Sequence, residues 1–262
     1  MAMAWVDVNG NDTYYTEAGN GPPLVFLHGM SSCSEAWWQQ FEAFAGRFRV
    51  IAYDSVNHGH SANSPRGQEE PDRTDELEGF LAALGIERPF LAGNSMGGAT
   101  ILRWAARHPH QAAGLVVSGM GIAEPGAPAF RQIEPIDADT LFLPVGDSLT
   151  DRLRAERPLM YERYLRIRST ATRLEYMRHP RPRSQKTIAE TERLAETVTA
   201  VASPMLVIVG SLDRLVPNAK RLHALVPHSQ YHEVEGAPHN VYWEAAAEWN
   251  EVVGRFLGGI TA

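Results

Sequence analysis

The sequence predicts an α/β fold built on a mostly parallel β-sheet with helices on both faces. Short apolar runs alternate with stretches whose apolar residues recur at helical spacing. This alternation is typical of parallel strands, which are buried on both faces and joined by crossover helices. The chain has 262 residues, 44% of them hydrophobic, so it is long enough to bury one large core. The strand-like runs are 24–27, 50–53, 89–92, 115–117 and 205–209.

The sheet is expected to begin with an antiparallel pair of strands. Two strand-like runs, 5–8 and 13–16, flank the dipeptide Asn9-Gly10. This dipeptide suits the positive φ angles of a tight hairpin turn. The sequence therefore predicts a hairpin ahead of the parallel part of the sheet.

Two helices are expected to pack on the sheet through clear apolar faces. Gly85 follows the first face and supplies the left-handed residue that often ends a helix. The residues that form the two faces are Leu77, Phe80, Leu81 and Leu84, and Ala246, Trp249, Val253 and Phe256.

The alternation of strands and helices fails between about residues 124 and 199, where proline, arginine and short helical fragments dominate. We expect an inserted cap at 124–199, between a first core segment, 1–123, and a second, 200–262. Residues 152–183 contain 10 arginines against 3 glutamates. Such charge runs are mostly solvated helix faces. The alternative is that one or two of these arginines face the site and hold a substrate carboxylate through a bidentate contact.

The composition excludes several functional classes. A formal net charge of -7 disfavours general nucleic-acid binding. No apolar run approaches the roughly 20 residues that span a bilayer, and the first residues lack the features of a signal peptide. The single cysteine, Cys33, cannot form an internal disulfide. We expect a cytoplasmic protein that binds neither membrane nor nucleic acid and is a monomer or homodimer.

The sequence predicts no metal site and no cofactor. Two histidine pairs, His58/His60 and His108/His110, have no nearby carboxylate or cysteine pattern that would complete a ligand set. We expect them on the surface or in a supporting position. Cys33 is expected to be a small buried packing residue.

A possible nucleophile follows the strand-like run 89–92. The sequence Gly93-Asn94-Ser95-Met96-Gly97 precedes a helical stretch and matches the pattern G-x-S-x-G. In that pattern the turn is so tight that the positions two before and two after the serine must be small, which leaves the hydroxyl exposed. The sequence therefore predicts Ser95 as a nucleophile.

A serine hydroxyl needs a base to take its proton and a carboxylate to orient that base. Asp213 comes just after the strand-like run 205–209, where sites in α/β sheets are built. His239 follows another apparent strand, 231–234. We predict that Ser95, Asp213 and His239 form a catalytic triad.

Negative charge on the reacting carbonyl oxygen requires hydrogen-bond donors, an oxyanion hole. One donor is expected to be the backbone amide of Met96, directly after the nucleophile. The second is expected from the loop His28-Gly29-Met30, and we choose the amide of Met30.

These motifs together resemble the α/β-hydrolase superfamily over nearly the whole chain, in the order Ser95, Asp213, His239. The resemblance implies an eight-stranded, mostly parallel sheet with an inserted helical cap. The family turn D-x-x-G-x-G-x-S stands here as residues 54–61, with Asn57 in place of a glycine. Asn tolerates positive φ better than most residues, so the substitution is mild.

The residues around the nucleophile and the histidine are similar to those of carbon–carbon bond hydrolases that act on meta-cleavage products. The similarity covers 93–100, 213–217 and the residues after His239, including Trp243. The loop at 30–34 departs from that group, and so does Asn240, where those enzymes have tryptophan. By this resemblance Asn94, Trp243 and the cap residue Arg163 are candidates for substrate binding.

The sequence thus predicts a serine hydrolase that works through an acyl-enzyme on a small, largely apolar ester, as a carboxylesterase or lactonase does. One alternative is a carbon–carbon bond hydrolase of an anionic dienoate. A second alternative is a ligand-binding receptor that keeps the triad with negligible turnover. Haloalkane dehalogenases and epoxide hydrolases of this fold use an aspartate where Ser95 stands, so their chemistry is not expected.

Overall fold

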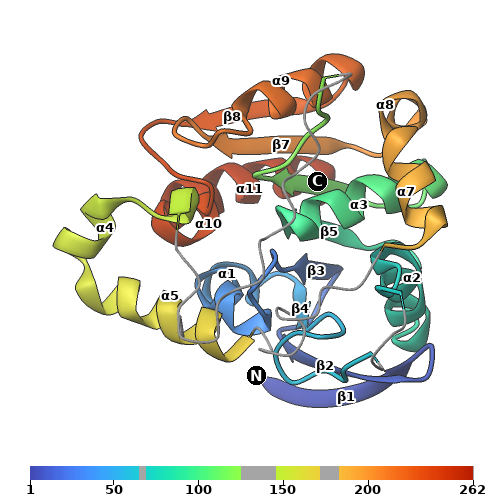
Figure 1. Cartoon of the computed structure of the whole chain (residues 1–262), viewed down its shortest axis with the longest axis horizontal. Helices are drawn as coiled ribbons and strands as arrows, with labels where there is room; N and C mark the ends of the chain where they lie inside the picture. The colour runs from blue at the N-terminus through green and yellow to red at the C-terminus, as the bar shows by residue number, and fades with distance from the viewer. Residues whose placement is uncertain (65–68, 125–145, 172–182, 262) are drawn as a thin grey trace.

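One eight-stranded sheet organises the chain (Figure 1). The computed structural model describes residues 1–64, 69–124, 146–171 and 183–261. The strand order is β1-β2-β4-β3-β5-β6-β7-β8. The pairs β1–β2 and β2–β4 are antiparallel and the others are parallel, so the predicted, mostly parallel eight-stranded sheet is confirmed. The strands are β1 (Ala2–Val8), β2 (Asn11–Ala18), β3 (Pro23–Leu27), β4 (Arg49–Tyr53), β5 (Phe90–Asn94), β6 (Gly114–Ser118), β7 (Met205–Gly210) and β8 (Gln230–Val234).

The predicted hairpin joins β1 to β2. Val8 pairs with Asn11, and the two residues between them have φ angles of 55° at Asn9 and 83° at Gly10. Both angles are positive, as the mirror-image turns that match the twist of paired strands require.

Helices cover both faces of the sheet, and the alternation of side chains along the strands explains why. On β3, Leu24 and Phe26 belong to one buried cluster, whereas Val25 and Leu27 belong to another on the opposite face. The first cluster is covered by α1 (Trp38–Phe44) and α11 (Ala246–Thr261). The second is covered by α2 (Arg73–Ala83), α3 (Met96–Arg107) and α9 (Val216–Leu225).

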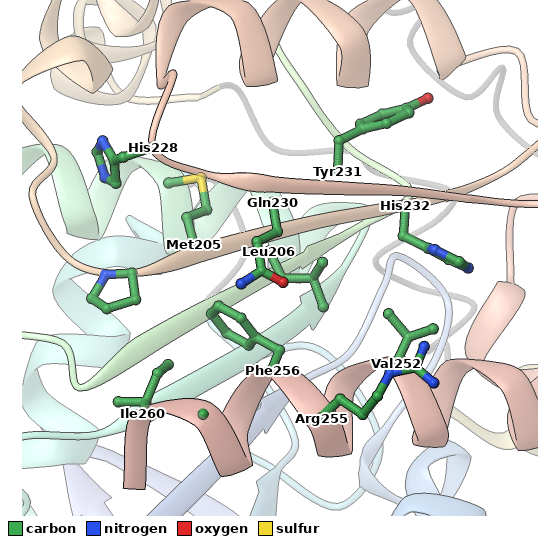
Figure 2. A pocket seen from close by; sticks show the side chains of 12 residues that line it. Met205, Leu206, His228, Gln230, Tyr231, His232, Val252, Arg255, Phe256 and Ile260 are labelled. Carbon is green, nitrogen blue, oxygen red and sulfur yellow. The ribbon is translucent and has the colours of Figure 1, made fainter. Parts of the chain in front are cut away.

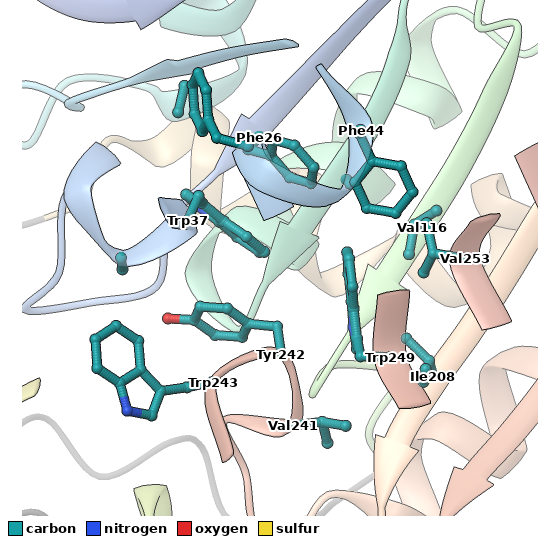
Figure 3. Close-up of a cluster of buried hydrophobic side chains, with 14 of the residues drawn as sticks. Phe26, Trp37, Phe44, Val116, Ile208, Val241, Tyr242, Trp243, Trp249 and Val253 are labelled. Atoms are coloured by element: carbon teal, nitrogen blue, oxygen red, sulfur yellow. The ribbon is translucent and has the colours of Figure 1, made fainter. Parts of the chain in front are cut away.

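Aromatic side chains form the centre of the first cluster (Figure 3). The ring of Trp37 stacks on Phe26 with 4.7 Å between centroids and on Tyr242 with 4.2 Å. Trp37 belongs to the short helix η1 (Ser34–Trp37) and Tyr242 to α10 (Val241–Glu244). The stack therefore holds the segments after β3 and β8 against the same face of the sheet.

The two helices predicted from apolar faces are α2 and α11. Asp72 caps the amino end of α2, where its side chain accepts hydrogen bonds from the amides of Thr74 and Asp75. Gly85 follows the helix with a φ of 64°, which confirms its predicted role as a left-handed stop.

The connection between β6 and β7, residues 119–204, has two described helical parts. Figure 1 shows α4 (Asp151–Glu156) and α5 (Pro158–Ala171) beside α10 and α1, and α7 (Gln185–Glu192) and α8 (Leu194–Thr197) near α2 and α3. The short helix η2 (Gly146–Ser148) precedes α4, and η3 (Val198–Ala200) follows α8. The predicted cap limits, 124 and 199, stay a prediction, and 125–145 and 172–182 lie outside the described residues.

Arg107 links α7 to the core through ion pairs. The guanidinium of Arg107, at the end of α3, pairs with Glu190 of α7 at 2.7 Å and with Asp75 of α2 at 2.6 Å. Burial acts to lower the pKa of Arg107, but its hydrogen bonds to Glu190 and then Asp75 outweigh this effect and raise it. Within the described ranges, no helix has the length and apolar character needed to cross a bilayer.

Candidate active site

Ser95 lies in a strained turn between β5 and α3. Its φ of 52° and ψ of -110° are unusual for a residue with a side chain and cost about 1–3 kcal/mol. The turn is closed by hydrogen bonds from the Ser95 amide to the Ser118 carbonyl and from the Ala99 amide to the Ser95 carbonyl, each 2.9 Å long. A methyl group on Gly97 would collide with the carbonyl of Leu27. The predicted requirement for a small residue at this position is confirmed.

His239 and Asp213 are in direct contact. Nδ1 of His239 lies 2.8 Å from Oδ2 of Asp213, whose side chain is fully buried. The other carboxylate oxygen of Asp213 accepts a hydrogen bond from the Leu215 amide at 2.9 Å. Because Nδ1 donates its proton to the carboxylate, Nε2 is the nitrogen that can act as a base.

Gly119 brings the turns of Ser95 and His239 together. It follows Ser118, which accepts the Ser95 amide, and its φ is 54°. A Cβ at this position would lie 3.2 Å from Cε1 of His239 and 2.9 Å from Oδ1 of Asn94. The structure thus gathers the three predicted triad residues at the carboxyl edge of the sheet, after β5, β7 and β8.

The loop after β3 packs against the Ser95 turn. A Cβ on Gly29 would lie 3.5 Å from Cβ of Ser95, so the two segments approach each other closely. Among the described residues, neither the Met30 amide nor the Met96 amide has a hydrogen-bond acceptor. Two amides without acceptors beside a serine suit the oxyanion hole predicted from the sequence.

His28 fixes the start of this loop. Its Nε2 accepts the Ser55 amide at 3.0 Å, so Nδ1 carries the proton and donates it to the Gly29 carbonyl at 2.8 Å. Burial lowers the pKa of His28 and lowers that of His58 well below its ordinary value. The rings of His28 and His58 lie 5.0 Å apart. Both imidazoles are therefore neutral at pH 7.

The turn after β4 is hydrogen-bonded to the segment that follows β3. Asp54 is fully buried, and its carboxylate accepts the amides of Ser34 at 2.7 Å and His60 at 2.8 Å. Asn57, which stands where the family turn has glycine, adopts a φ of 70°, as its tolerance of positive angles predicted. Cys33 is buried as expected, and burial raises the pKa of its thiol well above the ordinary value.

The three residues predicted to bind substrate have well-defined contacts. Asn94 is 1% exposed and donates from Nδ2 to Oδ1 of Asn240 at 2.8 Å. Trp243 is fully buried, with its ring 6.5 Å from that of Trp38. The guanidinium carbon of Arg163 lies 4.0 Å from the centroid of Trp38. Their roles in binding stay predictions.

Sequence reasoning missed two polar residues of the site. It noted Asn240 only for replacing tryptophan, whereas the structure places its amide between Asn94 and the hydroxyl of Tyr164. In the cap, the resemblance singled out Arg163 and gave no role to its neighbour Tyr164. The sequence signal for a core-facing Tyr164 was its helical spacing of three from the apolar residue Ile167, which the structure buries.

A surface groove of about 330 Å³ lies elsewhere (Figure 2). Strands β7 and β8 and helix α11 line it, with Met205 and Gln230 at the amino ends of the two strands. Asp213 follows the opposite end of β7, so the groove is at the far edge of the sheet from the predicted triad residues. In the described part of the chain, no three histidine, cysteine or acidic residues gather as metal ligands.

Comparisons with known proteins agree with this architecture. Residues 22–246 match the family model described as alpha/beta hydrolase fold. The crystal structure of the enol-lactonase from Burkholderia xenovorans LB400 superposes with a TM-score of 0.79, at 23% identity, over 97% of this chain and 100% of that one.

Two curated relatives extend the comparison. The 2-hydroxy-6-oxononadienedioate/2-hydroxy-6-oxononatrienedioate hydrolase of Paraburkholderia phymatum is 28% identical over 270 residues, 94% of this chain and 90% of that protein. A putative non-heme haloperoxidase of Mycobacterium phage D29 is 44% identical over 100 residues, 38% of this chain and 36% of the phage protein.

We expect Gly119→Ala to destabilise the protein more than Gly236→Ala. Both residues have positive φ, 54° and 67°, and an alanine in that region costs about 1–2 kcal/mol. Only at Gly119 would the methyl group also press on His239 and Asn94, since space around Gly236 is open. Urea unfolding should show an additional loss of about 1–3 kcal/mol for Gly119→Ala. Equal losses in the two variants would refute the close approach of His239.

We expect the free energy of unfolding to fall as the pH drops below about 6.5. The unfolded chain then binds protons that buried His28 and His58 exclude, which costs up to about 1.4 kcal/mol per pH unit for each histidine. His58→Asn should remove one histidine's share of this slope in urea unfolding between pH 5 and 8, whereas exposed His110→Gln should not. An unchanged slope in His58→Asn would contradict the neutral, buried state.

Proposed function

The chain belongs to the alpha/beta hydrolase fold family, and we propose that it is a serine hydrolase that cleaves small, largely apolar esters or lactones. The proposal rests on one observation above the others. His239 is hydrogen-bonded to a buried carboxylate at the same sheet edge where Ser95 occupies its strained turn. A serine, a base and an orienting acid in this order are the parts that acyl transfer requires.

The reaction begins when Nε2 of His239 takes the proton of Ser95 as its oxygen attacks the carbonyl carbon. The Met30 and Met96 amides donate hydrogen bonds to the oxygen that gains negative charge, and each donor can contribute about 3 kcal/mol. His239 then gives the proton to the departing alkoxide. This leaves the acyl group on Ser95.

Water completes the cycle by the same route. His239 removes a proton from water, the hydroxide attacks the acyl carbon, and the proton returns to Ser95 as the acid leaves. Asp213 stays ionised and stabilises the imidazolium in both halves. Its contact with the Leu215 amide fixes the carboxylate that orients His239.

A carbon–carbon bond hydrolase acting on an anionic dienoate is the second candidate. It is favoured by three N–H groups that are buried and have no acceptor among the described residues. They are Nε of Arg163 and Nε1 of Trp38 and Trp243. Donors of this kind suit a carboxylate, and the curated relative from Paraburkholderia phymatum is named for hydrolysis of dienedioates. On such a substrate the dienol becomes a ketone before Ser95 attacks.

An organophosphonate should label Ser95 stoichiometrically, because the activated oxygen displaces the leaving group on phosphorus and retains the adduct. Mass spectrometry should find one adduct per chain, absent in Ser95→Ala. The matched control Ser169→Ala, at an exposed position of α5, should be labelled like the wild type. An unlabelled wild type would refute catalysis and support a ligand-binding receptor.

Substrate class is decided by a direct comparison of rates. We expect turnover of p-nitrophenyl butyrate, and no cleavage of a 2-hydroxy-6-oxo dienoate followed by its absorbance. The contrary outcome is cleavage of the dienoate by the wild type. If Arg163→Gln then lowers that rate about 10- to 100-fold and the exposed control Arg166→Gln leaves it unchanged, the substrate is the dienoate and not the ester.

A further inference from the structure

A buried chain of side-chain hydrogen bonds joins the Ser95 turn to helix α5. Nδ2 of Asn94 donates to Oδ1 of Asn240 at 2.8 Å, and Nδ2 of Asn240 donates to the Tyr164 hydroxyl at 2.7 Å. The same hydroxyl accepts Nη1 of Arg168 at 3.3 Å. Asn94, Asn240 and Tyr164 are 1%, 6% and 5% exposed. This series of hydrogen bonds therefore runs from the core to the β6–β7 connection with almost no access to solvent.

The two asparagines flank the reacting groups. Asn94 directly precedes Ser95, and Asn240 directly follows His239. Their hydrogen bond therefore fixes the backbone of the nucleophile turn relative to that of the histidine turn. A shift of either turn would stretch this bond, and misplacement by about 1 Å can cost about 100-fold in rate.

The histidine turn is also paired with the β6–β7 connection through its backbone. The amide of His239 donates to the Asp147 carbonyl, and that of Asn240 donates to Ser148, both at 3.1 Å. Further along, Glu244 of α10 accepts the Thr150 amide at 2.9 Å. The position of His239 is therefore set by this connection as well as by the sheet.

Tyr164 is the point where these restraints meet α5. Its ring packs edge-on against Trp243, with centroids 5.4 Å apart, and its hydroxyl is the acceptor for Asn240. Without that hydroxyl, the Asn240 amide would be buried with an unpaired N–H, which costs more than the bond itself contributes. The relative position of the Ser95 turn and the His239 turn is thus coupled to the packing of α5 on the core.

We propose that Asn240 and Tyr164 are positioning residues that align His239 with Ser95 only when α5 is packed on the core. The inference rests on the proposed serine-hydrolase function. Neither side chain exchanges a proton with substrate, and both act through the relative placement of the two turns. Their loss should therefore slow the chemical steps and leave the binding of a small ester almost unchanged.

The test compares Tyr164→Phe, Asn240→Ala and their double variant with the control Tyr161→Phe. Tyr161 lies on the same helix, the guanidinium of Arg154 lies 5.8 Å from its ring centroid, and its hydroxyl has no hydrogen-bond partner among the described residues. We expect kcat for p-nitrophenyl butyrate to fall about 5- to 20-fold in each single variant with KM within about twofold. The double variant should be no slower than the slower single variant, since the two substitutions interrupt the same series of hydrogen bonds. Tyr161→Phe should match the wild type.

A readout that needs no turnover completes the test. The proton between Nδ1 of His239 and Oδ2 of Asp213 should give a downfield resonance in proton NMR spectra. Tyr164→Phe should shift or broaden it, whereas Tyr161→Phe should not. Circular dichroism establishes which variants fold, and either single variant that folds is sufficient.

The outcomes separate this inference from the proposed function. If the phosphonate labels the wild type but Tyr164→Phe and Asn240→Ala keep wild-type kcat and resonance, the positioning role is refuted and the function stands. A raised KM with unchanged kcat would also refute it, because that assigns the pair to substrate binding. A wild type that is neither labelled nor active overturns both.

Discussion

The positive φ of Ser95 is the constraint on which the rest of this site depends. A residue with a side chain adopts that backbone only where its surroundings leave no alternative. Here β5 is fixed between β3 and β6, and α3 packs so closely that Gly97 lies against the Leu27 carbonyl. The strain is local, whereas the packing that offsets it comes from the two buried faces of the sheet.

Several buried polar groups around this turn are hydrogen-bonded, which helps the loops to hold their shape without regular structure. Asp54 accepts two backbone amides, and His28 uses both ring nitrogens on its neighbours. Buried polar groups of this kind impose one geometry, because any other arrangement would leave them unpaired. The amides of Met30 and Met96 lack acceptors among the described residues, and the buried oxygens Oδ1 of Asn94 and Oγ of Ser31 lack partners there too.

Local sequence patterns were enough to predict the sheet, the hairpin at Asn9-Gly10 and the placement of Ser95, Asp213 and His239 after strands. Each depends on a turn or a period that neighbouring residues encode. The contact of Arg163 with Trp38 and the link from Asn94 to Tyr164 were not predictable in this way. These contacts join residues 76 to 146 positions apart in the chain, and most of them depend on how the β6–β7 connection packs.

In the proposed mechanism the reacting groups are Ser95, Asp213 and His239, which follow strand ends, so the β6–β7 connection could vary the pocket without moving them. The two parts are independent only if no rigid contact joins them. Here Tyr164 of α5 is hydrogen-bonded to Asn240, one residue from His239, and Asp147 and Ser148 pair with the same turn. Under the proposed function, changes in α5 that alter substrate contacts are therefore expected to alter the placement of His239 as well, so specificity and rate would be coupled in this chain.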